Sequence, residues 1–377
     1  MALIITIIAF IIVLGGVVFV HELGHFLAAK RSGVKVEEFV LGFPPLIYKK
    51  QVGETLYGLG LIPFGGYNKI LGEDVNDPNA IANPRSYESQ KPLIKFLIIA
   101  GGIFMNLILA AVIFYFLAVS SGFQLWQTLL YPDYKFPFGQ QENFPMIAGV
   151  FSGSAADKAG LEAKDAILSA NGTSISNSTD FMDFISKNQE KEISLNLKNT
   201  KSGQERSVKL KLGKDDGTKQ ALGVALADTA LISYKEPFEK ISVGFLHSYN
   251  ITDFSFSTIG RIIKSSFVEK DASLLGVSFV GPVGIFAATK IIINQGWFEM
   301  LNLCGIISLA LATTNILPIP AFDGGKIVFI FLQAIDKKRF TLAMQYKIEQ
   351  AGALVLIGLA ILITLKDFWV FKDIIFK

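Results

Sequence analysis

The chain begins with an unbroken apolar run, ALIITIIAFIIVLGGVVFV (Ala2–Val20), which continues directly into HELGH (His21–His25). A helix needs about 20 apolar residues to cross the hydrocarbon core of a bilayer, so this run is long enough for a transmembrane helix. Ionisable side chains are costly in that setting and usually serve a function. The two histidines and the glutamate therefore mark a candidate site at the end of a membrane span.

The composition also favours a membrane protein. The 377 residues are 51% hydrophobic, and the net charge at pH 7 is only +3. No basic tract indicates a nucleic-acid partner. A single cysteine, Cys304, excludes an intrachain disulfide and any zinc site built on two or more cysteines of the chain. The start lacks a basic region and a small-residue cleavage site, so we expect the first apolar run to be retained as a span.

Further apolar runs extend the membrane prediction. Phe96–Val119 and Met300–Phe322 are long enough to cross a bilayer, and Ala351–Leu365 is short enough to require tilting or the help of Phe368–Phe371. Ile327–Ile335 is apolar but too short to cross, so we predict a membrane-embedded half-helix. We expect a polytopic α-helical membrane protein with about four transmembrane helices.

Lysine and arginine predict the orientation of these spans. They gather in two short segments, 30–95 and 326–347, which four spans place on the same side of the membrane. The positive-inside rule assigns that side to the cytoplasm. The N-terminus, the 120–298 region and the C-terminus are then outside.

Residues 34–72 alternate in a strand-like way and are punctuated by glycine and proline, which predicts a small β-hairpin sheet. Because the sheet follows HELGH within a few residues, it can lie at the membrane edge beside that motif. The alternative is a cytoplasmic loop with no special task.

Residues 145–228 have the pattern of a compact α+β domain. SAADKAG (Ser154–Gly160) reads as an N-capped short helix ended by glycine, and Asn171-Gly172 is a strong hairpin turn. Residues 178–188 have helical spacing. After this domain, residues 238–267 have apolar positions at helical spacing with interspersed charges, which suits a helix at the membrane interface.

The chemistry of the opening motif follows from its spacing. Histidines at i and i+4, here His21 and His25, project from one face of a helix and can share one zinc ion. Glu22 between them can act as the base for water attack on an amide. A lone H-E-x-x-H can also be a solvated helix face. However, the chain has only three histidines, two of which form this motif.

A zinc hydrolase site normally has three protein ligands and one open position. Asp323 ends the third apolar run within NILPIPAFDGG (Asn315–Gly325), where two prolines stop a helix and two glycines permit a sharp turn. We predict Asp323 as the third ligand. The alternative is that it caps the half-helix that starts near Lys326.

Asn315 and Asn106 lie within the predicted spans. Either can orient the substrate backbone or stabilise an oxyanion. For Asn106, hydrogen bonding between helices is the alternative. The third histidine, His247, lies in the amphipathic region, where we expect an interfacial role unrelated to metal.

The order of these motifs resembles a known family. The pattern GSAADKAGL…KDAIL…NG resembles a PDZ domain of the circularly permuted bacterial protease type, which can add an extended peptide to a sheet edge. HELGH, GGIFMN (Gly101–Asn106), this domain and NILPIPAFDGG together resemble the bacterial site-2 protease family, close to its sigma-E regulators. PFGGYNKI (63–70) and VGPVGI (280–285) also resemble segments of that family.

The resemblance implies an intramembrane zinc metalloprotease of the bacterial cytoplasmic (inner) membrane. Its substrates would be transmembrane proteins, such as anti-sigma factors already trimmed by an upstream site-1 protease, or signal-peptide remnants. His21, His25 and Asp323 would bind Zn²⁺, Glu22 would activate water, and Asn315 would help to hold the substrate or the transition state. The chain departs from the family in having one PDZ domain where the sigma-E regulator has two. It also has Gly102-Ile103 where Gly-Pro is more usual.

The resulting division of the chain has nine segments. They are a first transmembrane helix with HELGH (1–33), a cytoplasmic-side β-hairpin region (34–92), a second transmembrane helix (93–119), a connector (120–144), an extracytoplasmic PDZ domain (145–230), an amphipathic interfacial region (231–297), a third transmembrane helix with NILPIPAFDG (298–323), a half-helix with a cytoplasmic loop (324–348), and a fourth transmembrane helix with the C-terminal tail (349–377).

Two other classes of protein share some of these features. A membrane PDZ adaptor or chaperone that has lost catalysis would keep the domain but has no need of HELGH together with Asp323. A zinc carrier would usually show paired or repeated polar spans, and none is visible.

Overall fold

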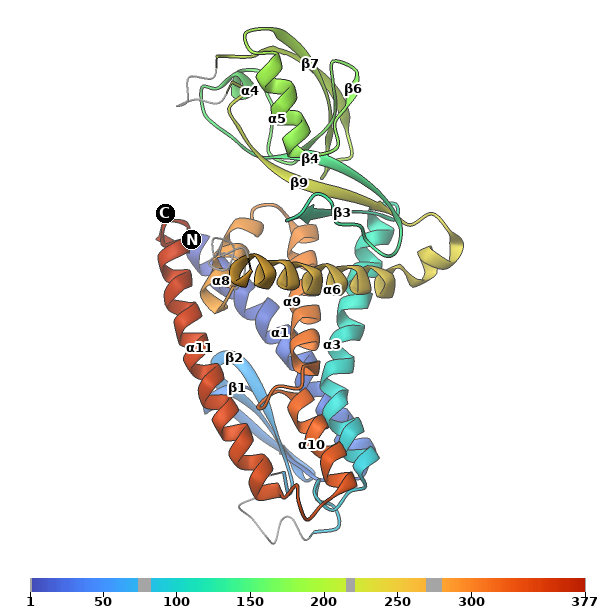
Figure 1. The fold of residues 1–377 in the computed structure, drawn as a ribbon. Helices are drawn as coiled ribbons and strands as arrows, with labels where there is room; N and C mark the ends of the chain where they lie inside the picture. The colour runs from blue at the N-terminus through green and yellow to red at the C-terminus, as the bar shows by residue number, and fades with distance from the viewer. Residues whose placement is uncertain (1, 74–82, 215–220, 269–279, 377) are drawn as a thin grey trace. The chain divides into compact units, whose positions relative to one another are not determined.

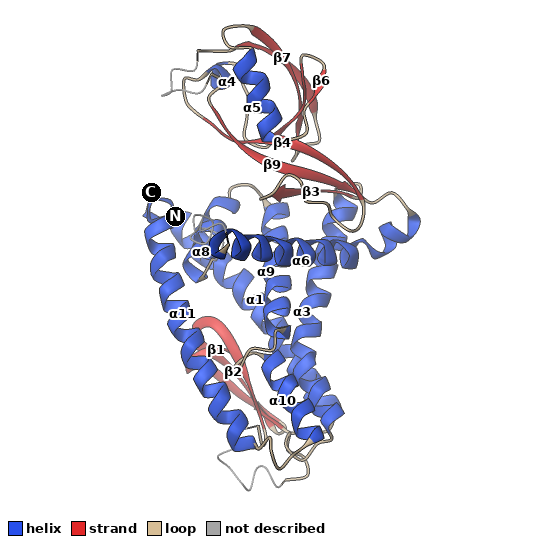
Figure 2. Ribbon diagram, in the orientation of Figure 1, coloured by secondary structure: helices blue, strands red, loops and turns tan. Residues whose placement is uncertain are grey.

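The computed structural model describes residues 2–73, 83–214, 221–268 and 280–376. The chain divides into two compact units, and each is described by itself. The membrane unit comprises Met1–Leu117 and Arg261–Lys377, and the second unit comprises Ala118–Gly260. Figures 1 and 2 show that the first is mainly helical and that the second is built around a β-sheet.

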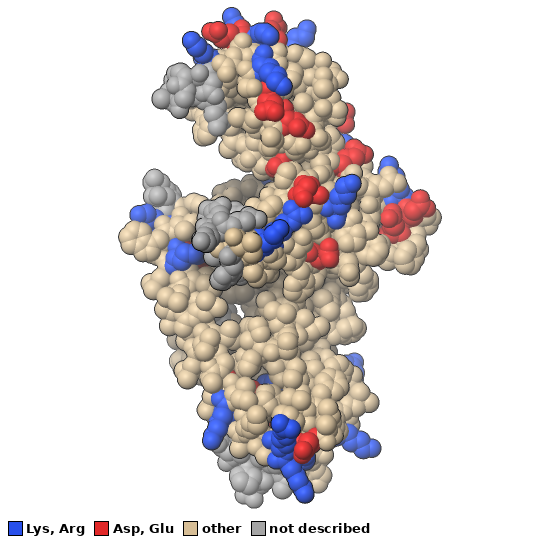
Figure 3. All heavy atoms as spheres, viewed as in Figure 1, with Lys and Arg blue, Asp and Glu red and all other residues tan. Residues whose placement is uncertain are grey.

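Among the described residues, four helices are long and apolar enough to cross a membrane. They are α1 (Ala2–Arg31), α3 (Pro92–Ser120), α9 (Trp297–Ile316) and α11 (Leu342–Phe376). In Figure 1 the start of α1 and the end of α11 lie at the same end of the membrane unit, as an even number of spans requires. Figure 3 shows a broad band of this unit with few charged side chains. Leu354 and Trp369 of α11 are each 72% exposed, which suits contact with lipid.

Helix α1 continues beyond the apolar run to Arg31, because ELGHFLAAKR contains good helix formers. HELGH therefore lies inside the helix, in keeping with a first helix over 1–33 that carries this motif. One predicted span boundary is wrong. Helix α9 ends at Ile316, so Met300–Phe322 is not one helix. Pro318 and Pro320 follow, and proline lacks the N–H that a continuing helix needs.

The half-helix α10 (Asp323–Ile335) begins four residues earlier than the predicted Ile327, with Asp323 as its first residue. Its cap position is Phe322, and no side chain caps it, so Asp323 does not have the alternative capping role. A Cβ atom on Gly324 would lie 2.2 Å from the carbonyl oxygen of Leu317. Only glycine permits this close return of the chain, which fixes the position of Asp323.

The predicted hairpin sheet is present as two long, bent strands, β1 (Val36–Val52) and β2 (Thr55–Ile70). Two segments of β2 pair with β1, one on each side of it: Phe39 of β1 pairs with Tyr57 on one side and with Asn68 on the other. Gly66–Ile70, the edge segment, pairs only with residues 36–41 within the described chain. Strand β2 also packs against α1, which carries HELGH.

The VGPVGI segment leads into a short apolar helix, α8 (Pro282–Ile292). Oδ2 of Asp367, a fully buried residue of α11, accepts hydrogen bonds from the backbone N–H groups of Gly281 (2.7 Å) and Gly284 (2.9 Å). A Cβ atom on Gly284 would lie only 3.0 Å from that oxygen. A carboxylate from α11 therefore caps α8, and the glycines of the motif make the approach possible.

The second unit contains a seven-stranded sheet in the order β3-β9-β4-β5-β7-β8, with β6 paired to β5. Its core includes Ile167, Phe181 and Leu195, all fully buried. The elements are β3 (Gln124–Leu129), β4 (Gln140–Val150), α4 (Ala155–Lys158), β5 (Asp165–Ala170), β6 (Thr173–Ser174), α5 (Ser178–Lys187), β7 (Glu192–Asn199), β8 (Glu205–Lys211) and β9 (Val224–Ser233).

The expectation that 120–144 is a separate connector is wrong. Residues 124–129 form β3, and residues 140–144 are the start of β4; both strands pair with β9. The partner strand lies about 100 residues further along the chain, so the alternation of this aromatic-rich segment could not reveal the pairing. The sheet therefore extends beyond the predicted limits of 145–230.

Helix α6 (Pro237–Phe267) forms where the amphipathic pattern predicts it. His247 within it is 3% exposed, and its Nδ1 lies 3.0 Å from the hydroxyl of Tyr234. Burial lowers the pKa of His247 to about 3, so this side chain is neutral at physiological pH. The contact gives His247 a structural role in the second unit, apart from the histidines of HELGH.

Candidate metal centre

Helix α1 presents His21 and His25 on one face, and the start of α10 brings Asp323 to them. The Nε2 atoms of the two histidines are 3.2 Å apart, and Oδ2 of Asp323 lies 3.2 Å from one and 3.3 Å from the other. His21 is 7% exposed and His25 is 8% exposed. Among the described residues, these three form the one group of histidine, cysteine and acidic side chains with the spacing of a metal site.

The three donor atoms fit a zinc ion. Zinc bonds to histidine and carboxylate are about 2.0–2.2 Å long, so neighbouring ligand atoms around a tetrahedral ion lie about 3.3 Å apart. The observed separations of 3.2, 3.2 and 3.3 Å match that spacing. Two imidazoles and one carboxylate are also the kind of ligand set that leaves a fourth position open in a catalytic site.

Contacts with α3 orient the two histidines. Nδ1 of His25 lies 2.9 Å from the carbonyl oxygen of Ile98, to which it can donate, leaving Nε2 free to bind metal. The side-chain amide of Asn106 lies 3.5 Å from Nδ1 of His21. Asn106 is fully buried, and its backbone carbonyl accepts a hydrogen bond from Ser308 of α9. Asn106 of α3 therefore contacts His21 of α1 at Nδ1, not at Nε2, and Ser308 of α9 through its backbone. Both are contacts between helices.

Gly102 of α3 faces the metal centre directly. A Cβ atom there would lie 2.3 Å from Nε2 of His25 and 2.8 Å from Cε1 of His21. Gly24 and Gly101 bring the backbones of α1 and α3 into contact, since a Cβ on Gly24 would lie 2.2 Å from the Gly101 carbonyl oxygen. The pair of glycines in GGIFMN thus does more than permit helix contact, because Gly102 leaves room for the imidazoles of His21 and His25.

Gly102→Ala should weaken zinc binding by about 10- to 100-fold, because the new methyl group displaces a ligand nitrogen. Zinc content can be measured on purified protein by elemental analysis during titration with a chelator. Gly16→Ala is the matched control, since a Cβ on this glycine of α1 has nothing within 4 Å. Equal zinc retention by both variants would contradict the expectation.

Glu22 and Asn315 are the remaining predicted site residues. Glu22 is partly buried, and its carboxylate Oε2 accepts a 2.7 Å hydrogen bond from Nδ2 of Asn68 in β2. Asn315 is in the last turn of α9 and is partly buried, but no hydrogen bond joins it to the described residues of the centre. Sequence reasoning missed Asn68; its one signal was a polar residue in the strand GGYNKI beside HELGH.

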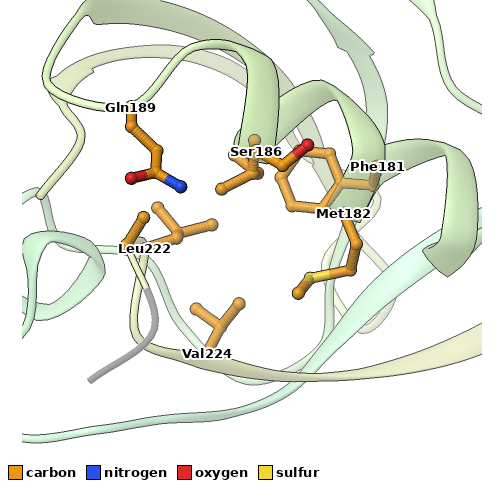
Figure 4. Close-up of a pocket in the computed structure, with 8 residues that line it drawn as sticks. Phe181, Met182, Ser186, Gln189, Leu222 and Val224 are labelled. Atoms are coloured by element: carbon orange, nitrogen blue, oxygen red, sulfur yellow. The ribbon is translucent and has the colours of Figure 1, made fainter. Parts of the chain in front are cut away.

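A second candidate site is a groove in the second unit, shown in Figure 4. Helix α5 lines one side with Phe181, Met182 and Ile185, and the other side is lined by Val224, the first residue of β9, and by Leu222 just before it. Strand β3 pairs with β9 only along residues 228–233. In the described residues, Val224–Ala227 therefore pair with β4 alone, and their other edge has no strand partner, as strand addition by a peptide requires.

Comparison with known proteins identifies the family. The model of peptidase family M50 matches residues 9–359. A Clostridium perfringens protein whose name describes a zinc metalloprotease is 30% identical over 350 residues, covering 93% of this chain and 94% of the relative. The regulator of sigma-W protease RasP of Bacillus subtilis is 26% identical over 439 residues, covering 96% of this chain and 98% of the relative. A chloroplastic membrane metalloprotease of Arabidopsis thaliana is 28% identical over 376 residues, covering 94% and 78%.

Family membership agrees with the ligand set, the apolar helices and the order of the motifs. The chain therefore belongs to peptidase family M50 and is a multi-pass membrane zinc metalloendopeptidase of the site-2 protease type.

Proposed function

We propose that His21, His25 and Asp323 hold the catalytic zinc and that Glu22 is the general base for cleavage of transmembrane segments of membrane proteins. The observation that carries this assignment is the convergence of three buried ligand atoms within 3.3 Å of one another. Zinc, when bound, supplies Lewis-acid chemistry that lowers the pKa of water and polarises a carbonyl.

The residues of the chain then have separate tasks. The carboxylate of Glu22 takes the proton from the attacking water and passes it to the leaving amine. The buried histidines and Asp323 would fix the reacting position. Asn315, at the end of α9, would hold the substrate backbone or the transition state.

A transmembrane substrate must unwind before it is cut, because a helical amide is shielded and its carbonyl is already hydrogen-bonded. Backbone groups released in hydrocarbon need new partners. The edge segment Gly66–Ile70 has an open side within the described chain and belongs to the sheet that packs on α1. Pairing of the unwound substrate with this segment would supply those partners close to Glu22.

The second unit has the features of one PDZ domain, with α5 and β9 forming a peptide groove and β3 extending the sheet beyond it. We place this domain and both termini outside the cytoplasmic membrane, on the basis of lysine and arginine in 30–95 and 326–347. Protease added to spheroplasts, in which the outer face of the cytoplasmic membrane is accessible, should then cut the second unit, and full protection would contradict this orientation.

Substrates would be membrane proteins already shortened on their outer side by a site-1 protease, such as anti-sigma factors, or signal-peptide remnants. RasP is named as a regulator of sigma-W protease, which supports this class of substrate.

Cleavage of a single-span model substrate should be at least about 10-fold faster when its outer domain is short than when it is a large folded domain, because only a short segment can reach a buried site and unwind. The purified enzyme in detergent and then in vesicles would be incubated with both substrates, and fragments measured by gel and mass spectrometry. A substrate with the same span and a flexible outer segment of equal length controls for size alone. Equal rates for all three would contradict a requirement for prior trimming.

A further inference from the structure

We propose that Asn68 is a positioning residue for the reaction, which holds the Glu22 carboxylate in place from the membrane sheet. This inference rests on the proposed role of Glu22 as general base. It adds that Asn68, a residue of β2, supports Glu22 in that role.

The contacts of the Asn68 amide define its orientation. Its Nδ2 lies 2.7 Å from Oε2 of Glu22 and 2.7 Å from the backbone carbonyl oxygen of the same residue. A carbonyl oxygen and a carboxylate oxygen both accept hydrogen bonds, so only the NH₂ end of the amide can face them. The choice between the two ends of the amide, which is often ambiguous, is therefore determined here by chemistry.

Both N–H bonds of Asn68 are used on one residue. The other end of the amide, Oδ1, is buried and has no hydrogen-bond partner in the described part of the chain. An asparagine that served the stability of the sheet would be expected to pair both ends, since a buried unpaired acceptor is unfavourable. Within the described residues, the Asn68 side chain therefore makes its polar contacts with Glu22 alone.

Asn68 is also held firmly enough to position another side chain. It lies in the edge segment and pairs with Phe39 of β1. Two residues earlier, Gly66 packs on the same glutamate, since a Cβ there would lie 3.5 Å from Cγ of Glu22 and 2.8 Å from the carbonyl oxygen of Val40. A site built on a strand in this way restricts the carboxylate to one orientation, which is what proton transfer to and from a fixed position needs.

The test uses two substitutions of similar size, Asn68→Leu and Asn68→Asp. Leucine removes the donor, and aspartate puts a second carboxylate where two acceptors already lie. Thr55→Val is the matched control, because it removes a buried 2.7 Å hydrogen bond from Thr55 to Val36 in the same sheet without touching Glu22. The full-length proteins would be purified in detergent, and kcat, KM and zinc content measured at pH 7–8 with a single-span model substrate.

We expect both Asn68 variants to keep stoichiometric zinc and a KM within about two-fold of wild type, while kcat falls by about 10- to 100-fold. Aspartate should be at least as damaging as leucine, although it fits the asparagine site better. A purely structural role predicts the opposite order. Thr55→Val should leave kcat within about two-fold.

The inference fails if either Asn68 variant keeps the wild-type kcat with zinc bound, or if aspartate restores turnover that leucine loses. Glu22→Gln measured beside them separates this failure from that of the proposed function. An inactive Glu22→Gln with fully active Asn68 variants overturns only the role of Asn68. A fully active Glu22→Gln overturns the proposed base itself.

Discussion

Glu22→Gln should lower kcat for cleavage of a single-span substrate by about 10²- to 10⁴-fold, the usual contribution of a general base. This corresponds to ~3–5 kcal/mol of transition-state stabilisation. Glutamine has the same shape but cannot take a proton, and it leaves the proposed ligand atoms of His21, His25 and Asp323 untouched. Fragment formation on gels gives kcat, and elemental analysis should find zinc still bound at the wild-type level.

Glu37→Gln is the matched control for this substitution. It makes the same chemical change on β1, where the carboxylate lies 3.5 Å from the amines of Lys35 and Lys69. Turnover should remain close to wild type. A Glu22→Gln protein with normal turnover would be inconsistent with Glu22 as the base. The result also separates an enzyme from an adaptor or a zinc carrier, whose functions should hardly change.

Asp323→Ala should reduce zinc affinity by about 10³-fold or more, beyond the 10- to 100-fold loss typical of residues that only support a ligand. Removing the carboxylate leaves two buried imidazoles, which alone form an incomplete zinc site. Cleavage should disappear together with the metal. Chelator titration followed by elemental analysis measures the affinity, and added zinc should not restore full activity at concentrations that saturate the wild type.

The opposite end of α10 offers the control. Oδ1 of Asp336, at the C-cap, accepts hydrogen bonds from the backbone N–H groups of Lys338 and Arg339, both 3.0 Å away. Asp336→Ala removes an acid from the other end of the same helix, away from the candidate metal centre, so zinc content should not change. If Asp323→Ala retained stoichiometric zinc, Asp323 would not be the third ligand.

Local patterns in the sequence were sufficient where neighbouring residues decide the structure. The Asn171-Gly172 turn forms with φ of 49° and 81°, the left-handed geometry that this pair tolerates best. The short helix after Ser154 is capped by that serine, whose side chain accepts from the N–H of Asp157. The i, i+4 spacing of His21 and His25 likewise placed two candidate ligands on one helix face before any fold was known.

Patterns were less reliable at boundaries and between distant segments. The third span was extended to Phe322 on apolar character, although the prolines of NILPIPAFDGG already indicated a helix end; the structure ends α9 at Ile316, before the first proline. The strands within 120–144 were missed because their partner, β9, is distant in the chain.

The sequence by itself indicated the four apolar spans, the candidate metal motif and the acid proposed to complete it, because each depends on side-chain chemistry and short-range spacing. The tertiary structure alone decided that Asn68 holds Glu22, that Gly102 leaves room for the imidazoles and that Asp367 caps α8. These contacts join residues far apart in the chain, and their existence depends on how close two backbones approach. Neither periodicity nor composition predicts the distance between two backbones.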